Sequence, residues 1–211
     1  MKRKLIAAAI LIVNLASAQY GYRDANRIGI GAGVNQFTLN TNNFDTKPGI
    51  GWSAGLSVRG NYYNNFSMIY SIQFSENNFE VATQNGLIRE DVKFKLPAAQ
   101  IALLLSYNLI ENHLSVDFGP MIQVNGKMKI DEGFEDNTVT GTDMTAKQLT
   151  DISKFGIFPT VGISGGLTNL RLNVSYQYGL TNMLGNLNDK GYGNNYKGHA
   201  GILTGTIIVY L

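Results

Sequence analysis

His113 and Ser115 are the pair of residues in this chain whose types and spacing best fit a chemical reaction. A histidine beside a serine can act as the base that removes the hydroxyl proton before attack on an acyl group. Residues two apart on a β-strand project from the same face, so the pair would share one face of a strand. The pair raises the hypothesis of a lipid-modifying hydrolase, against the alternative of an ordinary turn histidine at a membrane interface.

Two other patterns resemble ligand sites but fit them poorly. The segment 29–33 has glycine at every second position, yet Val34 stands where the dinucleotide-binding pattern needs its next glycine. Alternate glycines on the inner face of a crowded barrel explain the repeat. Acidic residues gather in the segment 126–153 without the spacing of a calcium-binding EF-hand, which favours a solvated acidic loop: Asp131, Glu132, Glu135, Asp136 and Asp143. The sequence therefore predicts no cofactor, no metal site and no catalytic residue.

The first 18 residues have the form of a secretory signal peptide. Residues 2–4 are basic, 5–15 form an apolar run interrupted by one asparagine, and 16–18 form the small-residue pattern that signal peptidase recognises. The run is too short for a membrane-spanning helix, which needs about 20 apolar residues. We expect cleavage after Ala18, which divides the chain into a signal peptide, 1–18, and an outer-membrane β-barrel domain, 19–211.

Charge and cysteine content narrow the class of protein. Removal of the signal peptide takes three of the 17 basic residues and none of the 15 acidic ones, leaving 14 against 15, a formal charge of −1. This balance gives no support for a nucleic-acid partner. The chain has no cysteine, which excludes thiol catalysis and disulfides. A secreted chain of this kind needs another means of stabilisation, such as a closed hydrogen-bonded sheet.

Apolar and small polar residues alternate along the mature chain. In the segment 50–59, for example, Ile50, Trp52 and Leu56 occupy one face and Ser53 and Ser57 the other. Such period-two alternation predicts β-strands. Eight segments show it: 28–37, 50–59, 66–75, 95–107, 114–125, 155–165, 170–181 and 200–211. An even number of strands suits an antiparallel sheet that closes with both termini on one side, so we predict an all-β fold, an eight-stranded antiparallel up-and-down transmembrane β-barrel.

Three features favour a membrane barrel over a soluble sandwich. The segments are close to the ~9–11 residues of a tilted transmembrane strand. Their polar faces carry Gly, Ser, Asn and Gln and few charges. Short connections near 61–65, 108–113 and 167–169 alternate with long ones near 38–48, 76–93, 126–153 and 182–198. Short periplasmic turns and long outer loops are typical of Gram-negative outer-membrane barrels, so both termini are expected in the periplasm.

Aromatic residues and two prolines add detail to this prediction. Trp52 lies near the outer end of its strand, and four aromatic residues lie near inner ends, as in the girdles at membrane interfaces: Tyr62, Phe66, Tyr107 and Tyr210. Pro120 and Pro159 fall in mid-strand, where neither can donate a backbone hydrogen bond. If their strands pair symmetrically about the loop between them, the two prolines meet at a shared β-bulge.

Three short motifs carry a family resemblance. Leu96-Pro97 precedes an apolar strand that ends at Ser106-Tyr107, Phe118-Gly119-Pro120 lies in the next strand, and the seventh strand ends in the sequence YQYGLTN from Tyr176 to Asn182. These motifs resemble the PorT-like outer-membrane β-barrel proteins of Bacteroidota. The resemblance implies an eight-stranded outer-membrane barrel. Members near PorT itself take part in type IX secretion or gliding.

Charged residues fall at inward-facing positions near the periplasmic ends of three strands: Arg59, Asp117 and Arg171. Side chains just fill the bore of an eight-stranded barrel, so charges there must be paired or reach water. We predict that Asp117 contacts at least one of the arginines and that the cluster is structural and plugs the lumen. Three glutamines would continue a polar interior without an open pore: Gln73, Gln123 and Gln177.

The predicted function is that of a non-enzymatic integral outer-membrane barrel with a filled lumen. It would act through its extracellular loops or as a structural or accessory component, with a secretion-related role implied by the family resemblance. The expected partners are outer-membrane lipid, the barrel-assembly machinery during insertion, and an envelope protein complex. The alternatives are a hydrolase that uses His113 and Ser115, and a narrow channel.

Overall fold

The computed structural model describes residues 26–211 except residues 112 and 194. The predicted signal peptide, 1–18, and its cleavage site after Ala18 lie outside the described residues.

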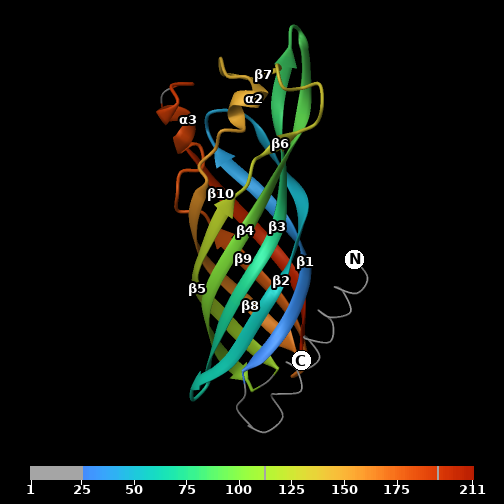
Figure 1. The fold of residues 1–211 in the computed structure, drawn as a ribbon, viewed down its shortest axis with the longest axis vertical. Coiled ribbons are helices and arrows are strands. Elements are labelled where there is room, and N and C mark those ends of the chain that lie inside the picture. The colour runs from blue at the N-terminus through green and yellow to red at the C-terminus, as the bar shows by residue number, and fades with distance from the viewer. Residues whose placement is uncertain (1–25, 112, 194) are drawn as a thin grey trace, which may run out of the picture.

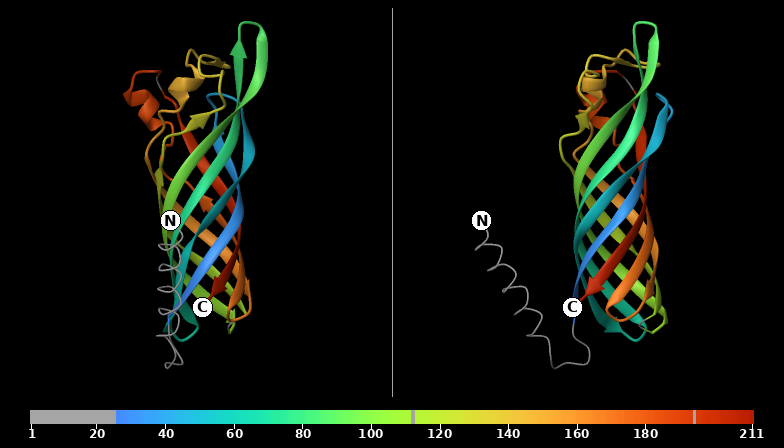
Figure 2. Two further views of the ribbon diagram at one scale, coloured as in Figure 1. Left: turned by 45° about the vertical axis from the view of Figure 1, so that its right-hand side comes forward. Right: turned by 90° about the vertical axis from the view of Figure 1, so that its right-hand side faces the viewer.

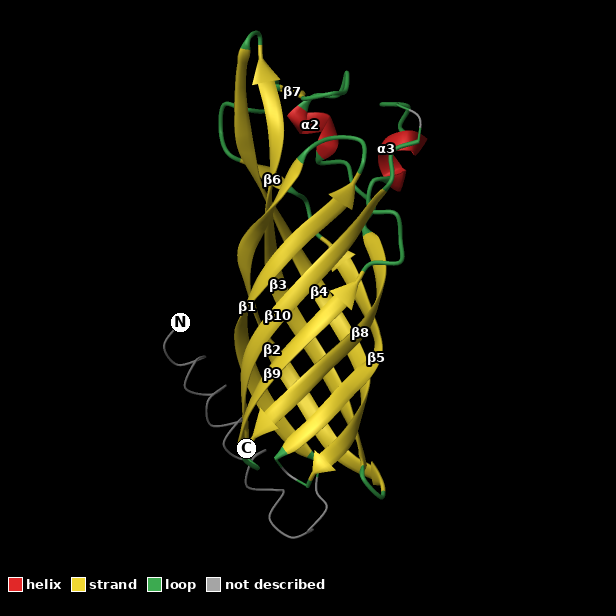
Figure 3. Ribbon diagram, turned by 180° about the vertical axis from the view of Figure 1, so that it is seen from behind, coloured by secondary structure: helices red, strands yellow, loops and turns green. Residues whose placement is uncertain are grey.

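Eight long antiparallel strands form a closed barrel (Figures 1 and 3). In their order around the wall they are β1 (Arg27–Thr41), β2 (Thr46–Tyr63), β3 (Phe66–Asn85), β4 (Ile88–Ile110), β5 (Leu114–Asn125), β8 (Phe155–Gly166), β9 (Leu170–Tyr178) and β10 (Gly198–Tyr210). The last strand pairs with the first from Tyr210↔Gly29 to Gly198↔Thr41, which closes the ring. The predicted eight-stranded antiparallel barrel is confirmed.

The two ends of the barrel differ in their connections. Three short connections, after Tyr63, after Ile110 and after Gly166, lie with the C-terminus at what we call the turn end. At the opposite end, the strand extensions and long connections form what we call the crown: residues 37–48, 76–96, 126–154 and 179–198 (Figure 2). The crown contains β6 (Lys129–Ile130), β7 (Thr138–Val139), α2 (Ala146–Leu149) and α3 (Gly185–Asp189). Within the described residues no helix is long and apolar enough to cross a membrane.

The strand faces exchange their polarity along the barrel axis. In β1 near the turn end, Ile30 and Val34 are exposed on the outer face and the inner face carries glycines and Asn35. Towards the crown the inner face carries the buried side chains of Phe37 and Leu39, and the outer face becomes polar. β3 and β4 show the same exchange. An apolar belt therefore surrounds a mainly polar interior near the turn end, and a polar surface surrounds an apolar interior in the crown.

The segment 76–93, predicted as a loop, is instead a continuation of two strands. β3 and β4 stay paired without interruption to Asn85↔Ile88 and project beyond the other strands (Figure 1). Gly86 has φ 62°, in the left-handed region that favours glycine, and allows the two-residue turn. The expectation was wrong, because the segment forms paired strands despite its charged side chains. They belong to the outer face of a hairpin whose inner face buries Phe79 and Phe94.

Pro120 and Pro159 face each other directly across β5 and β8. Their predicted proximity is confirmed, but the predicted bulge is wrong, because the β5–β8 register continues unshifted on both sides. Two residues without N–H groups fit a non-hydrogen-bonded pair, where both nitrogens point to the outer neighbours. Accordingly, the β4–β5 ladder omits Leu103 and Leu104, and the β8–β9 ladder begins only at Thr160.

Of the aromatic residues predicted near the inner ends, three lie on the outside of the barrel at the turn end. Tyr62 is exposed, and the rings of Phe66 and Tyr107 pack across adjacent strands with centroids 5.1 Å apart. The placement of Tyr210 in this girdle was wrong. Its side chain is buried inside the barrel, where its hydroxyl lies 3.2 Å from Ser57 Oγ. A Cβ on Gly29 would come within 2.8 Å of the Tyr210 ring, so glycine provides its space.

Candidate functional site

The crown contains a closely packed apolar core. Side chains from strand extensions, loops and both short helices are buried there, among them Leu39, Phe79, Phe94, Leu149, Leu184 and Leu187. The rings of Phe79 and Phe94 stack with centroids 5.5 Å apart. α2 begins with a capping box, in which Thr145 Oγ1 accepts from the Gln148 amide and the Gln148 side chain accepts from the Thr145 amide. The crown is therefore a folded unit that covers the end of the lumen.

Asparagine side chains fix the loop around α3. Asn182 Oδ1 accepts from the Leu184 and Gly198 amides at 3.1 and 2.9 Å. Asn188 pairs with the Tyr196 backbone through both of its amide atoms, at 2.9 and 2.8 Å. These side chains replace the backbone partners that a sheet would provide. The long connection predicted near 182–198 is therefore held in one conformation by its asparagines in the part that the structure describes.

A charged contact joins the loop that contains α2 (126–154) to the loop that contains α3 (179–198). Asp151 Oδ2 lies 2.6 Å from Lys190 Nζ and accepts from the Tyr192 hydroxyl at 3.0 Å. The hydrogen bond from Lys190 is the main reason that the pKa of Asp151 lies below its ordinary value. The same carboxylate raises the pKa of Lys190 and of Tyr192. The contact links the α2 loop to the α3 loop.

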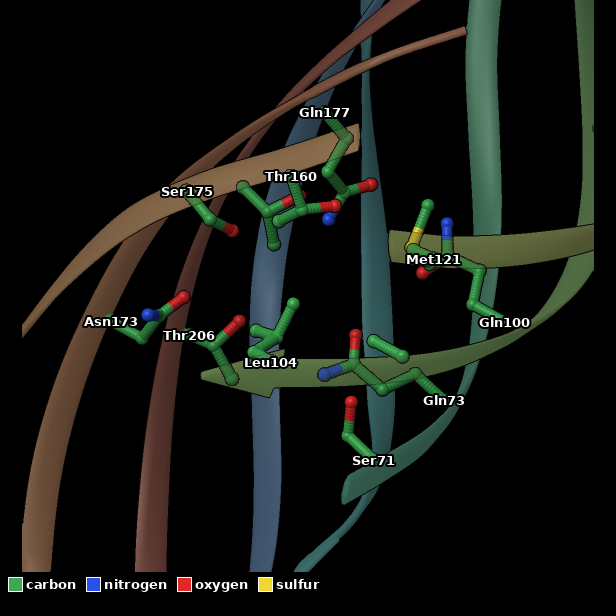
Figure 4. A pocket seen from close by; sticks show the side chains of 12 residues that line it. Ser71, Gln73, Gln100, Leu104, Met121, Thr160, Asn173, Ser175, Gln177 and Thr206 are labelled. Carbon is green, nitrogen blue, oxygen red and sulfur yellow. The ribbon is translucent and has the colours of Figure 1, made fainter. Parts of the chain in front are cut away.

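Below the crown, the middle of the lumen holds a small polar chamber of about 40 Å³ (Figure 4). The side chains of Gln73, Gln100, Gln177 and Ser175 surround it, with Leu104 and Met121 on its apolar side. Gln177 Oε1 is buried without a hydrogen-bond partner among the described residues. Because one water needs about 10–15 Å³, the chamber has room for a few water molecules.

Asp117 is the centre of a hydrogen-bond network at the turn end of the lumen. Its side chain is 1% exposed. It accepts from the hydroxyls of Ser106, at 2.5 Å, and Ser115, at 3.1 Å, from the Ser164 hydroxyl, and from Asn173 Nδ2 at 3.2 Å. These donors come from four strands, β4, β5, β8 and β9. The network therefore ties together one side of the wall from within.

Arg59 and Arg171 both reach this network through Ser115. Arg59 Nη2 donates to Ser115 Oγ at 3.1 Å and to Ser106 Oγ at 2.6 Å, and Arg171 Nη2 donates to Ser115 Oγ at 3.3 Å. The structure thus brings the three predicted lumen residues to the same end, inside the barrel. Among the described residues, hydroxyl groups connect Asp117 to the arginines, and the ion pairs within 4.0 Å lie elsewhere, in the crown.

His113 and Ser115 are not arranged as a base and a nucleophile. His113 is exposed in the turn before β5, with Nδ1 2.8 Å from the Glu111 carbonyl oxygen. Ser115 is fully buried in the lumen and donates its hydroxyl proton to Asp117. Sequence reasoning assigned Ser115 a chemical role in the alternative hypothesis and missed its structural one. The alternation along the strands places Ser106, Ser115 and Ser164 on the inner face, and this pattern could have indicated the structural role.

The acidic segment of the crown lies at its surface. Asp131 pairs with Lys95 at 3.1 Å, and Glu135 Oε2 accepts from the Gly133 amide. Glu132, Asp136 and Asp143 are exposed. Within the described residues, no group of three or more His, Asp or Glu side chains is arranged to hold a metal ion.

Comparison with known proteins shows similarity in fold. No protein-family model and no curated protein sequence matches this chain. Among solved structures, Neisserial surface protein A (NspA) aligns with a TM-score of 0.50 and 15% identity over 88% of this chain and 99% of its own. Ail, the attachment invasion locus protein of Yersinia pestis, crystallised with the heparin analogue sucrose octasulfate, aligns at 0.49 and 13% identity over 88% and 99%. At this identity the likeness to NspA shows the fold alone: the chain is an eight-stranded β-barrel of that kind.

Proposed function

We propose that this chain is an integral outer-membrane β-barrel with a closed lumen that acts through its crown as a non-enzymatic structural or accessory component. The exchange of polarity along the strands carries the proposal. Near the turn end, large apolar side chains are exposed all round the wall, among them Leu56, Ile72, Ile101, Val161 and Leu172. Such a belt is unfavourable in water and suits hydrocarbon. Residues 1–18 would be removed as a signal peptide during export.

Because the lumen is closed, we assign the activity of the protein to the crown and not to transport through the barrel. The turn-end network, the small chamber and the apolar crown core follow each other along the bore, which disfavours a narrow channel. The separation of His113 from Ser115 disfavours the hydrolase. The PorT-like resemblance supports a role in an envelope complex connected with secretion.

The topology is testable because the chain has no cysteine, so one introduced cysteine is a unique label. Leu87, fully exposed at the tip of the β3–β4 hairpin, and Leu167, exposed in a short turn, mark the two ends. With a membrane-impermeant maleimide, Leu87→Cys should react on intact cells. Leu167→Cys should react only after the outer membrane is permeabilised. Reaction of both or neither on intact cells, or of Leu167→Cys alone, would contradict the proposal.

The accessory role needs a separate experiment. The affinity-tagged chain, crosslinked in cells and purified, should retain a specific set of envelope proteins. A variant in which residues 79–92 are replaced by a two-residue turn should lose them while its barrel still resists denaturation. Recovery of the same proteins with both chains would exclude the hairpin as the contact surface.

A further inference from the structure

An unusual cluster of lysines lies in the crown, where the apolar wall of β5 and β8 ends. The outer face of this wall finishes with Val124 and Phe155, which are register partners and both about half exposed. Lys127 follows β5 by two residues, and Lys154 directly precedes β8. The Asn125 amide donates to the Lys154 carbonyl at 2.7 Å and holds the two chain segments at one level. Basic residues thus begin where the apolar belt stops.

Above this boundary lies a cleft of about 780 Å³. Three of its lining residues are the exposed lysines Lys127, Lys129 and Lys147. The buried side chain of Met128 and the half-buried Ile130 supply an apolar part of the lining. With three lysines against the two carboxylates of Glu135 and Asp151, the cleft has a small excess of positive charge and an apolar component. Its lining begins at Lys127, two residues after the end of β5.

The acidic residues of the crown leave these lysines without ion-pair partners. Two carboxylates line the cleft: Asp151 is paired with Lys190, and Glu135 accepts from the Gly133 amide. Asp131 is paired with Lys95. Within the described residues, no carboxylate lies within 4.0 Å of the ammonium groups of the three cleft lysines. Lysine ammonium groups bind phosphate as point charges.

We propose that the cleft binds the phosphorylated headgroup of an outer-leaflet lipid whose acyl chains lie against the wall below, at Val124 and Phe155. The inference rests on the proposed membrane location. A lipid fits better than a soluble anion because the cleft lining starts at Lys127, shortly after the exposed apolar residue Val124, so one amphipathic molecule can contact both. Basic residues next to a membrane surface are attracted to anionic headgroups.

The test compares lipid retention by the full chain in detergent micelles, measured by native mass spectrometry. The probes are bisphosphorylated lipid A and its dephosphorylated form. The wild-type chain should retain one bisphosphorylated molecule and bind the dephosphorylated form at least tenfold more weakly. The triple variant Lys127→Gln, Lys129→Gln, Lys147→Gln should lose affinity by roughly tenfold to a hundredfold. The triple Lys→Arg variant should keep it.

A matched control removes the same charge elsewhere in the crown, through Lys47→Gln, Lys93→Gln and Lys197→Gln, and should bind as the wild type does. Equal retention by both glutamine triples would overturn the proposal. So would equal binding of glucosamine phosphate without acyl chains, which would identify a soluble phosphate as the ligand. Insertion of each chain into vesicles is measured separately by quenching of Trp52, the single tryptophan, with brominated lipid. Failure to insert would count against the proposed function, whereas insertion without lipid discrimination would count against the cleft alone.

Discussion

Phe94 and Ser106 point inward from the same strand, β4, into opposite surroundings. Phe94 lies in the apolar core of the crown, beneath a surface that carries most of the charged residues of the described chain. Ser106 lies in the turn-end network, inside a wall whose outer face is apolar. The crown has an apolar interior and a polar surface, as water-soluble proteins have. The barrel below it has a polar interior and an apolar surface. One continuous strand can have both arrangements because only its side chains change, while the backbone ladder satisfies its own polar groups throughout.

The largest expected effect comes from the polar interior. Asp117→Ala leaves four donors without their shared acceptor and removes the carboxylate that lies near the two arginines, which should cost about 3–5 kcal/mol. Urea unfolding from vesicles, followed by Trp52 fluorescence, measures it. Asp143→Ala, at an exposed crown position, is the control and should change little. An Asp117→Ala barrel as stable as the control would mean that the network adds nothing to the lower half.

The crown core should respond locally. Leu149→Ala removes a fully buried side chain of α2 and should cost the crown about 3 kcal/mol. Since the lower barrel has its own interior, the crown should become sensitive to protease while the wall stays intact. Limited proteolysis, read as fragment masses, tests this separation. Leu87→Ala, at the exposed hairpin tip, should leave the pattern unchanged. Loss of the whole barrel with Leu149→Ala would show that the two regions form one cooperative unit.

The outer face of β1 is apolar near the turn end and polar in the crown, which allows a comparison within one strand. Ile30→Lys places a charge in the apolar belt and should cost about 2–3 kcal/mol in a bilayer. Asn40→Lys, on the same face but in the crown, should cost almost nothing. Unfolding from vesicles measures both variants. Equal losses of unfolding free energy for Ile30→Lys and Asn40→Lys would contradict the assignment of the lower part of this face to the membrane and of the upper part to water.

The smallest effect concerns pH. The pKa of Asp151 is lower in the folded crown than its ordinary value of 3.8, mainly through Lys190. The ionised Asp151 carboxylate therefore contributes its full stabilisation to the crown above that value. This stabilisation is lost as the pH falls through the lower pKa of the folded state. Acid should weaken the junction of the α2 and α3 loops. Protection of the Tyr192 amide, which donates to Leu187, reports it by hydrogen exchange. Asp151→Asn should be less protected at neutral pH and nearly insensitive to acid.

Sequence alone predicted the wall well because alternation is a local signal. The side chains of Ile50, Trp52 and Leu56 all face outward as expected. The crown was less predictable, since its core is assembled from residues far apart in the chain without regular spacing. Met183, Leu184 and Leu187 belong to this core but lie in the segment near 182–198, which the sequence predicted only as a long connection.

The turn-end network was predictable in part. Strand phase placed Arg59, Asp117 and Arg171 inside and at one end, because two-residue periodicity fixes the face of each side chain. The connecting role of Ser115 depended on the register between five strands, which no single segment encodes. Tyr210 was misplaced for a related reason: its aromatic character suggested an interface, while its phase placed it inside, opposite Gly29.

The facing prolines have a mechanical consequence. Backbone hydrogen bonding is interrupted on the β4 side of β5 and on the β9 side of β8, where it resumes with the Leu180 amide donating to the Ile157 carbonyl. The ladder between β5 and β8 is continuous. β5 and β8 are thus firmly paired with each other and less continuously hydrogen-bonded to β4 and β9. This strand pair carries the 126–154 loop, and with it the lysine cleft, at its crown end. Slow amide exchange between β5 and β8, with faster exchange at Leu103, would mark the line where this wall opens first, since the Leu104 amide faces the unbroken ladder with β3.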